Sequence, residues 1–338
     1  MSKGFRRPVP CLVLAAALAG SQLATARAAV AAPIRTLEAG TLKVCLYAGF
    51  APFASKDKDG HWQGWDVDYL KAFAAENHLH FTVVEKDFDG IWLQPGKDQC
   101  DIAGTGISDT QARRTATGKA GDWSNTYYHV LRAFLVRTAD FTRLAKIDDL
   151  RGKKAIVTAG STANTDLCYR MQGSNIHPCK KADGDHPCHF PGLENFKETT
   201  RQQDPSCVFI EYPWKKDEKC AASDVAAGRD RDQDKGPPFA YGGGYGSVQA
   251  LACDSSDGEC AIASQALVTV WPHCNMASGG KAYAEPFSFV VRHADTGLLK
   301  ALNCYINSHK YEGTPIPVLS PLCASPPWTP APDKDCRQ

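Results

Sequence analysis

Arg113 and the Ser161-Thr162 pair have side-chain and backbone groups that can hold a small anion. An arginine guanidinium grips a carboxylate through two parallel charge-assisted hydrogen bonds. Ser161 and Thr162 follow an apolar strand pattern and a glycine, so they open a helix whose unpaired N–H groups and dipole favour an anion. An ordinary surface position is the alternative for Arg113, since Arg114 stands beside it.

A segment rich in histidine and cysteine is the second candidate for chemistry. It contains His177, Cys179, His186, Cys188 and His189. Both residue types bind zinc or copper, and the spacing permits the side chains to converge. Exported cysteines usually pair with each other. The preferred interpretation is therefore two disulfide cysteines beside solvated histidines, and we expect no metal and no cofactor.

Sequence patterns of enzymes are missing from the chain. It has no nucleophile elbow, no zinc-protease signature and no phosphate-binding loop. Glu211 would serve as a general acid only if its side chain faced a solute site. We therefore expect no enzymatic activity.

The first 31 residues have the composition of a secretory signal peptide. A basic start with Arg6 and Arg7 precedes an apolar run at 11–20, and an alanine-rich tract follows. The apolar run is too short to cross a bilayer. We expect cleavage near residues 26–32 and a mature protein that acts outside the cytoplasm. A net charge of +1 gives no reason to expect nucleic acid as a partner.

The apolar patterns predict alternating strands and helices. Strands are expected at 41–47, 79–84 and 100–103, with a helix capped by Asp66 and a short helix at 91–93 between them. This β-α-β-α-β order implies an α/β fold with a mostly parallel sheet. A second sheet is expected to begin after residue 147. Further strands are expected at 133–137, 155–158, 207–212, 260–263 and 287–292. Two more helices are expected, one beginning within 243–250 and a last one from Asp295 to Gly313.

The cysteines predict disulfide bonds. The chain has 14 cysteines, and removing Cys11 with the leader leaves an odd number in the mature protein. Cys45 and Cys100 lie on strands that would be neighbours in the first sheet, so we expect a bridge between them. Cys336, in the proline-rich tail, is the candidate for the unpaired thiol.

Short motifs in a fixed order give the chain a resemblance to a known family. They are Gly40 to Val44, Phe50-Ala51-Pro52-Phe53, Gly64-Trp65-Asp66-Val67-Asp68, Phe88-Asp89-Gly90, Cys100 to Ala103, the segment from Ser108 to Arg113, Asp122 to Tyr128, Leu150 to Lys153, Gly160-Ser161-Thr162 and the final helix. With these motifs the chain resembles the amino-acid-type periplasmic solute-binding proteins, family 3, which are receptors of ABC importers.

The resemblance implies a two-lobed, type II periplasmic-binding-protein-like fold. Each lobe is a mostly parallel sheet flanked by helices, and two hinge crossings are placed near 133–138 and 282–288. The expected divisions are 34–134 and 285–323 for lobe 1, 138–281 for lobe 2, cysteine-rich insertions near 172–205 and 214–245, and a tail at 324–338.

The resemblance also implies a solute site between the lobes. Arg113, Ser161 and Thr162 would hold a carboxylate. Phe50 and Phe88 would enclose the body of the solute, with core packing as the alternative. The remaining groups are Thr105, Gly106 and Ser108 as acceptors for an ammonium and Thr110 as a donor to the carboxylate.

One position departs from the family pattern. Many members place an aspartate where this chain has Gln265, and that aspartate neutralises the ammonium of the solute. A neutral amide lacks the charge term, and charge-assisted bonds are about twice as strong as neutral ones. Another acid, such as Asp66 or Glu211, would have to replace it, or the solute is not an ordinary α-amino acid.

The resemblance implies a monomeric receptor that captures an amino acid or related carboxylate for a membrane ABC permease. Two alternatives stay open. One is an accessory or sensory subunit without transport, suggested by the insertions. The other is a cleft enzyme like the cyclohexadienyl dehydratases of the same family.

Overall fold

A computed structural model describes two long stretches of the chain and several shorter ones. The long stretches are residues 33–141 and 282–309. The shorter ones are 149, 154–157, 161–163, 166, 208–211, 240–244, 267–275, 323, 326–328 and 336. Gln265, the segment from His177 to His189 and the leader lie outside the described residues.

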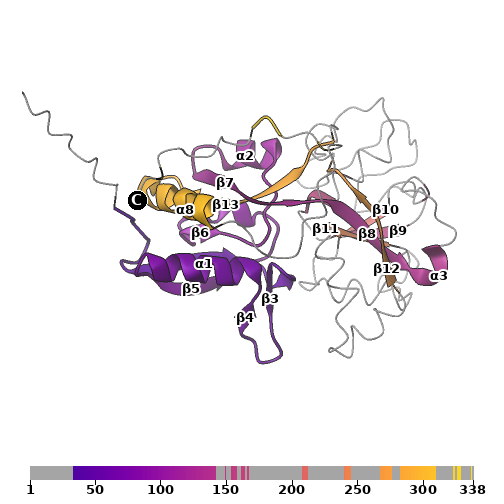
Figure 1. The fold of residues 1–338 in the computed structure, drawn as a ribbon, viewed down its shortest axis with the longest axis horizontal. Helices are drawn as coiled ribbons and strands as arrows, with labels where there is room; N and C mark the ends of the chain where they lie inside the picture. The colour runs from indigo at the N-terminus through magenta and orange to yellow at the C-terminus, as the bar shows by residue number, and fades with distance from the viewer. Residues whose placement is uncertain are drawn as a thin grey trace, which may run out of the picture. The chain divides into compact units, whose positions relative to one another are not determined.

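The first sheet has five strands in the order β5-β1-β6-β13-β7 (Figure 1). They are β1 (Thr41–Leu46), β5 (His80–Glu85), β6 (Ile102–Ala103), β7 (Gly121–Val130) and β13 (Glu285–Arg292). β1 pairs in parallel with both β5 and β6. β13 runs antiparallel between β6 and β7. β13, which comes late in the sequence, is therefore an interior strand of this sheet.

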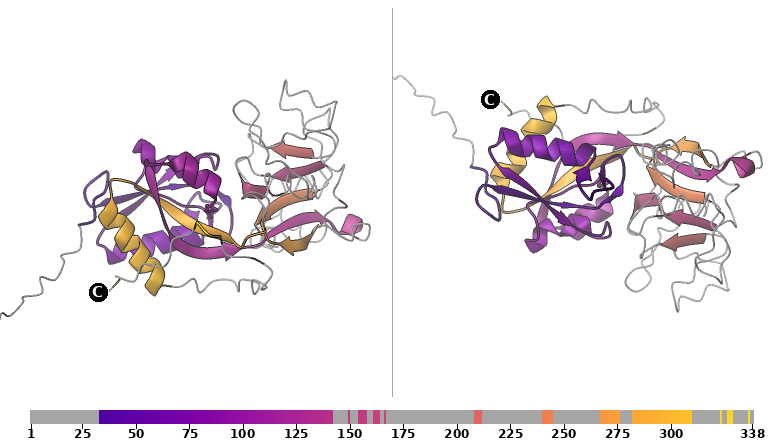
Figure 2. Two further views of the ribbon diagram at one scale, coloured as in Figure 1. Left: turned by 90° about the horizontal axis from the view of Figure 1, so that it is seen from above. Right: turned by 90° about the horizontal axis from the view of Figure 1, so that it is seen from below.

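Helices cover both faces of the first sheet. They are α1 (Trp65–Glu76), α2 (Gln111–Thr117) and α8 (Thr296–Ser308). α1 and α8 lie on one face and α2 on the other (Figure 2). The rings of Tyr69 in α1 and Tyr305 in α8 meet edge to face with centroids 5.0 Å apart. This contact joins the two helices over a fully buried apolar layer.

The second sheet repeats the pattern of the first, in the order β10-β9-β11-β8-β12. Its strands are β8 (Arg132–Arg137), β9 (Lys154–Val157), β10 (Val208–Glu211), β11 (Ala240–Gly244) and β12 (Leu267–His273). β9 pairs in parallel with β10 and β11, whereas β8 runs antiparallel between β11 and β12. Each sheet thus has a parallel core of three strands and an antiparallel strand that arrives from the other sheet.

The chain passes between the sheets twice. β7 of the first sheet leads into β8 of the second with one residue between them. The return from β12 to β13 passes through an antiparallel bridge between Asn275 and Tyr283. The first residue of each arriving strand is charged, Arg132 in β8 and Glu285 in β13.

Smaller elements complete the described part. A three-stranded sheet of β2 (Gly49–Phe50), β3 (Ala54–Lys56) and β4 (Trp62–Gln63) follows β1. Two 3-10 turns, η1 (Ile91–Leu93) and η2 (Pro95–Lys97), precede β6, and α3 (Thr138–Phe141) follows β8. None of the described helices is long and apolar enough to cross a membrane.

Two sequence predictions of local structure were wrong. Asp66 is not the cap of α1, because Gly64 occupies the N-cap position and Asp66 is the second helical residue. Gly64 has φ 117°, and a side chain there would clash with the backbone of Phe53. Gly243 lies in strand β11 instead of opening a helix. Both errors concern glycine-containing segments whose conformation depends on segments that lie beside them in the folded protein.

Disulfide bonds link strand β1 to the segment before β6, and helix α8 to the tail. The predicted bridge between Cys45 and Cys100 is confirmed, and both residues are fully buried, Cys45 in β1 and Cys100 two residues before β6. The prediction that Cys336 is unpaired was wrong, because Cys336 is bonded to Cys304 of α8. The error arose because pairing depends on proximity in space, which spacing in the sequence does not reveal.

The tail is also held through Trp328. Its indole N–H donates to the carbonyl oxygen of Asp109 over 3.0 Å, and its ring meets Tyr283 edge to face. A third disulfide joins Cys274, at the start of the return crossing, to Cys323. The tail therefore contacts both the crossing and the loop that leads into α2.

Replacing Cys304 and Cys336 together by alanine should lower the free energy of unfolding by about 2–4 kcal/mol, because this bridge closes a long loop. Urea unfolding of the wild type and the double variant measures the change. The matched control is the Cys45→Ala/Cys100→Ala pair, whose loss should be at least as large. Recovery of Cys336 as a free thiol in non-reducing peptide mapping would contradict the pairing.

Candidate functional site

The carboxylate of Glu285 is the centre of a buried polar cluster. Arg132 donates to both of its oxygens, with Nε 2.6 Å from Oε2 and Nη2 on Oε1. Asn275 donates its amide hydrogen to Oε2. Glu285 is 2% exposed and Arg132 5%. The first residues of the two arriving strands therefore form a desolvated ion pair.

Two hydroxyl groups complete the cluster. Ser108 donates its hydroxyl hydrogen to Oε1 of Glu285, and Thr162 donates to the same oxygen over 2.6 Å. The two hydroxyl oxygens lie 3.4 Å apart. Ser108 follows β6 of the first sheet, and Thr162 follows β9 of the second. The cluster thus unites two predicted site residues that are 54 positions apart in the sequence.

Glu285 is ionised despite its burial. Burial alone would raise its pKa, but the charge of Arg132 and the hydrogen bonds from Arg132, Ser108 and Thr162 outweigh that effect and lower the pKa below its usual value. A buried carboxylate with this many donors is a fixed negative charge at neutral pH.

Arg113 is buried and does not occupy the surface position considered above. It is 5% exposed, and its Nη1 donates to the carbonyl oxygen of Ser108 over 2.9 Å. Burial lowers its pKa to about 10, against the opposing attraction of Glu285, so the guanidinium stays charged at neutral pH. The neighbouring Arg114 instead makes a two-pronged ion pair with Asp109. That pair anchors α2 and leaves Arg113 directed toward the cluster.

Aromatic rings surround the guanidinium of Arg113. Its central carbon lies 5.5 Å from the ring centre of Phe88 and 4.3 Å from that of Trp92. Trp92 was not among the site residues predicted from the sequence. Phe50 lies one ring further on, with its centroid 6.3 Å from that of Phe88 and 5.2 Å from that of Phe53. The predicted aromatic walls are therefore neighbours of each other and of the predicted anion-binding arginine.

Thr105 and Gly106 form a turn with left-handed backbone. Their φ angles are 78° and 54°, and a non-glycine residue rarely adopts this conformation. The Thr105 hydroxyl accepts the N–H of Tyr47, and the Gly106 N–H donates to Asp66 over 2.6 Å. A side chain at Gly106 would stand 2.4 Å from the Phe50 ring. Glycine is required here by both the backbone angle and the close approach of the ring.

Asp66 stabilises this turn through hydrogen bonds to its carboxyl group. One carboxyl oxygen accepts the N–H of Gly106 and, over 2.9 Å, the hydroxyl hydrogen of Tyr127. Among the described residues none hydrogen-bonds the other oxygen. Burial raises the pKa of Asp66 to about 7, although the hydrogen bonds from Gly106, Tyr127 and Thr105 oppose the rise. Asp66 is a positioning residue for the turn that carries two predicted solute contacts.

Thr110 and Ser161 lie at the margins of the cluster. Thr110 caps α2, and its hydroxyl accepts the N–H of Arg113 over 3.2 Å. The Ser161 hydroxyl is buried, and no described residue hydrogen-bonds it. Thr110 thus fixes the backbone that presents Arg113, and Ser161 offers a polar group beside Thr162.

Sequence reasoning missed Glu285, Arg132 and Asn275. Each lies on or next to a crossing, and no motif marks them. The available signal was a single charged residue at the start of an otherwise apolar strand, as in EPFSFVV and RAFLV. A charge in that position is rarely buried unless it is paired.

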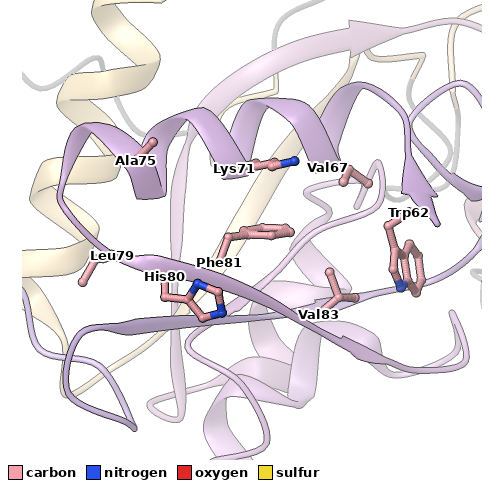
Figure 3. A pocket seen from close by; sticks show the side chains of 8 residues that line it. All are labelled: Trp62, Val67, Lys71, Ala75, Leu79, His80, Phe81 and Val83. Atoms are coloured by element: carbon pink, nitrogen blue, oxygen red, sulfur yellow. The ribbon is translucent and has the colours of Figure 1, made fainter.

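One described pocket lies away from this cluster. It has a volume of about 530 Å³ and is bounded by α1, β4 and β5 (Figure 3). The lining residues include Trp62, Val67, Lys71 and Phe81. None of the predicted site residues lines it. β5 is the edge strand of the first sheet, so this pocket lies at that edge of the sheet.

The pair of similar sheets, the two crossings and the buried cluster around Glu285 agree with a family match. The model of the bacterial extracellular solute-binding proteins, family 3, matches residues 42–315. The chain belongs to this family. The resemblance in the sequence motifs is thereby confirmed.

Individual relatives match part of the chain. An L-arginine-binding protein of Pseudomonas aeruginosa is 32% identical over 155 residues, which are 45% of this chain and 54% of that protein. A probable histidine-binding protein of Neisseria gonorrhoeae is 27% identical over 176 residues, 52% and 62% of the two chains. The cyclohexadienyl dehydratase of Pseudomonas aeruginosa is 27% identical over 164 residues, 48% and 59%. The chain spans less than two thirds of the length of each of these relatives.

Solved structures share the fold. The arginine-bound form of truncated ArgBP from T. maritima has a TM-score of 0.54 at 21% identity, covering 80% of this chain and 96% of that one. A putative binding component of an ABC transporter from Wolinella succinogenes, complexed with lysine, has a TM-score of 0.55 at 19% identity, covering 80% and 90%. The two-lobed fold expected from the sequence is therefore confirmed.

Replacing Asp66 by asparagine should flatten the pH dependence of stability. With its pKa raised to about 7, folded Asp66 keeps a proton that the unfolded chain releases near its ordinary value, so stability falls as the pH rises from 4 to 7. The loss is about 1.4 kcal/mol per pH unit at most. Urea unfolding at pH 5 and pH 8 should show a smaller difference for Asp66→Asn than for the wild type. Equal differences in both proteins would contradict the raised pKa.

Proposed function

We propose that this protein captures a small polar solute of the amino-acid class and delivers it to a membrane importer. The observation that carries the proposal is the meeting of Arg113, Ser108 and Thr162, which come from segments of both sheets. Arg113 is buried and charged, and the rings of Phe88 and Trp92 lie against it. A site of this composition suits a solute with both a charged end and an apolar body.

The relatives support the solute class. The similar proteins are named for the binding of arginine, histidine and cystine, and the similar structures hold arginine and lysine. We propose a monomeric protein acting in the periplasm, with an ABC permease as its partner. Gln265 is proposed to contact the ammonium group as an amide.

An enzyme is the second candidate function. The observation that favours it is the dehydratase among the relatives, whose identity to this chain is similar to that of the binding proteins. The buried acid nearest the site, Glu285, has a lowered pKa and is a poor proton donor. An absorbance assay for conversion of a cyclohexadienyl ring acid such as prephenate to an aromatic product, with loss of water and carbon dioxide, separates the two functions.

A thermal-shift screen of the mature protein against amino acids, small carboxylates and polyamines tests the binding proposal. A solute at about 100 times its dissociation constant should add about 2.7 kcal/mol of apparent stability and raise the melting temperature. In Arg113→Ala the shift should be lost, because the charged anchor is gone.

The matched control is Arg137→Ala, which removes an arginine that pairs with Asp140 outside the cluster. This variant should keep the full shift. A shift that persists in Arg113→Ala would contradict the assigned site, and the absence of any shift in the wild type would favour the accessory-subunit alternative.

A further inference from the structure

Glu285 contacts two hydroxyl groups of the predicted solute site: that of Thr162, assigned to the solute's carboxylate, and that of Ser108, assigned to its ammonium group. Both Ser108 and Thr162 donate to Oε1 of Glu285, the latter over 2.6 Å. A hydroxyl group carries a single hydrogen. While that hydrogen is donated to Glu285, it is not available to a carboxylate of the solute.

A second carboxylate at these hydroxyls would also meet a like charge. The distance between the hydroxyl oxygens of Ser108 and Thr162 is 3.4 Å, so an anion within reach of both would stand beside Oε1 of Glu285. The surroundings are buried, and like charges repel strongly where water is excluded. The solute carboxylate and Glu285 therefore exclude each other from this position.

The position of Glu285 is itself strongly determined. Arg132 donates to both of its oxygens, and Asn275 donates to Oε2. Arg132 also donates to the hydroxyl oxygen of Thr162. The Glu285 carboxylate is thus held next to the two hydroxyl groups by its hydrogen bonds with Arg132 and Asn275.

We infer that Glu285 is an internal competitor for the carboxylate of the solute and so determines how tightly the site holds solutes that bring one. The inference rests on the proposed function. It predicts a specific asymmetry between two solutes that differ only in the carboxylate. The solute that carries one is disfavoured by Glu285, and its decarboxylated amine is not.

The test is a calorimetric titration of the mature wild type and of Glu285→Gln with matched pairs of solutes. The pairs are L-arginine and agmatine, L-lysine and cadaverine, and L-histidine and histamine. Glu285→Gln should tighten binding of the amino acid by about tenfold or more, since like-charge juxtaposition costs several kcal/mol. The affinity for the matching amine should not rise, because the amine brings no carboxylate and its cation is attracted by the charge of Glu285.

Two further variants support the comparison. Glu285→Asp keeps the charge that neutralises Arg132 but is one methylene shorter, so it withdraws from the hydroxyls. It should also favour the amino acid over the amine, and it serves if Glu285→Gln does not fold, as checked by its melting transition. Glu38→Gln, at an exposed carboxylate remote from the cluster, should leave both affinities unchanged.

The outcomes separate the two claims. Solute binding with an unchanged ratio between amino acid and amine in both Glu285 variants overturns the inference and leaves the proposed function standing. Weaker amino-acid binding in those variants also overturns it. If no pair binds to the wild type or to either variant, the proposed function falls and the inference falls with it. Gain of amino-acid binding only in the variants supports the inference.

Discussion

The ion pair between Arg132 and Glu285 is the interaction on which the site depends. Each residue begins a strand that arrives from the other sheet, so one contact fixes both passages of the chain. Ser108 and Thr162 then bind the same carboxylate from the segments after β6 and β9. Separating the segments would leave a buried charge without its partner, which is unfavourable in free energy. The ion pair therefore keeps four separate segments in one arrangement.

The aromatic side of the site depends on a second buried acid. Asp66 binds the backbone of Gly106 and the hydroxyl of Tyr127, and the left-handed turn at Thr105 and Gly106 leaves room for the Phe50 ring. The two acids have opposite electrostatic character. Glu285 is surrounded by donors and stays charged, whereas Asp66 is desolvated with few partners and tends to keep its proton. Glu285 therefore supplies a fixed negative charge, whereas Asp66 supports the turn and changes its own charge near neutral pH.

Much of the fold follows from the sequence, because its signals are local. Alternating apolar residues in β1 and the neighbouring strands gave their positions within one or two residues, and the parallel arrangement placed Cys45 beside Cys100. The ordered motifs gave the family. The partner of Cys336 and strand β11 were not predictable, because they depend on segments distant in the sequence that come together only in the folded protein.

The site was predicted incompletely for the same reason. Arg113, Phe88, Ser108 and Thr162 were predicted from residue chemistry and motif order, and the structure brings them together, while their contact with a solute stays a prediction. Glu285 carries no local signal except a charge before an apolar strand, and its role appears only when both crossings meet. Gln265 lies outside the described residues, so its contact with a solute stays a prediction.

A double-mutant cycle on Arg132 and Glu285 tests this dependence most directly. The free energy of unfolding is measured in urea for the wild type, Arg132→Gln, Glu285→Gln and the double variant. Each single variant should lose about 3–5 kcal/mol, because a buried charge is left without its partner. The double variant should lose less than the sum of the two, by at least about 2 kcal/mol. Losses that add within about 0.5 kcal/mol would show that the two residues act independently and would contradict the account.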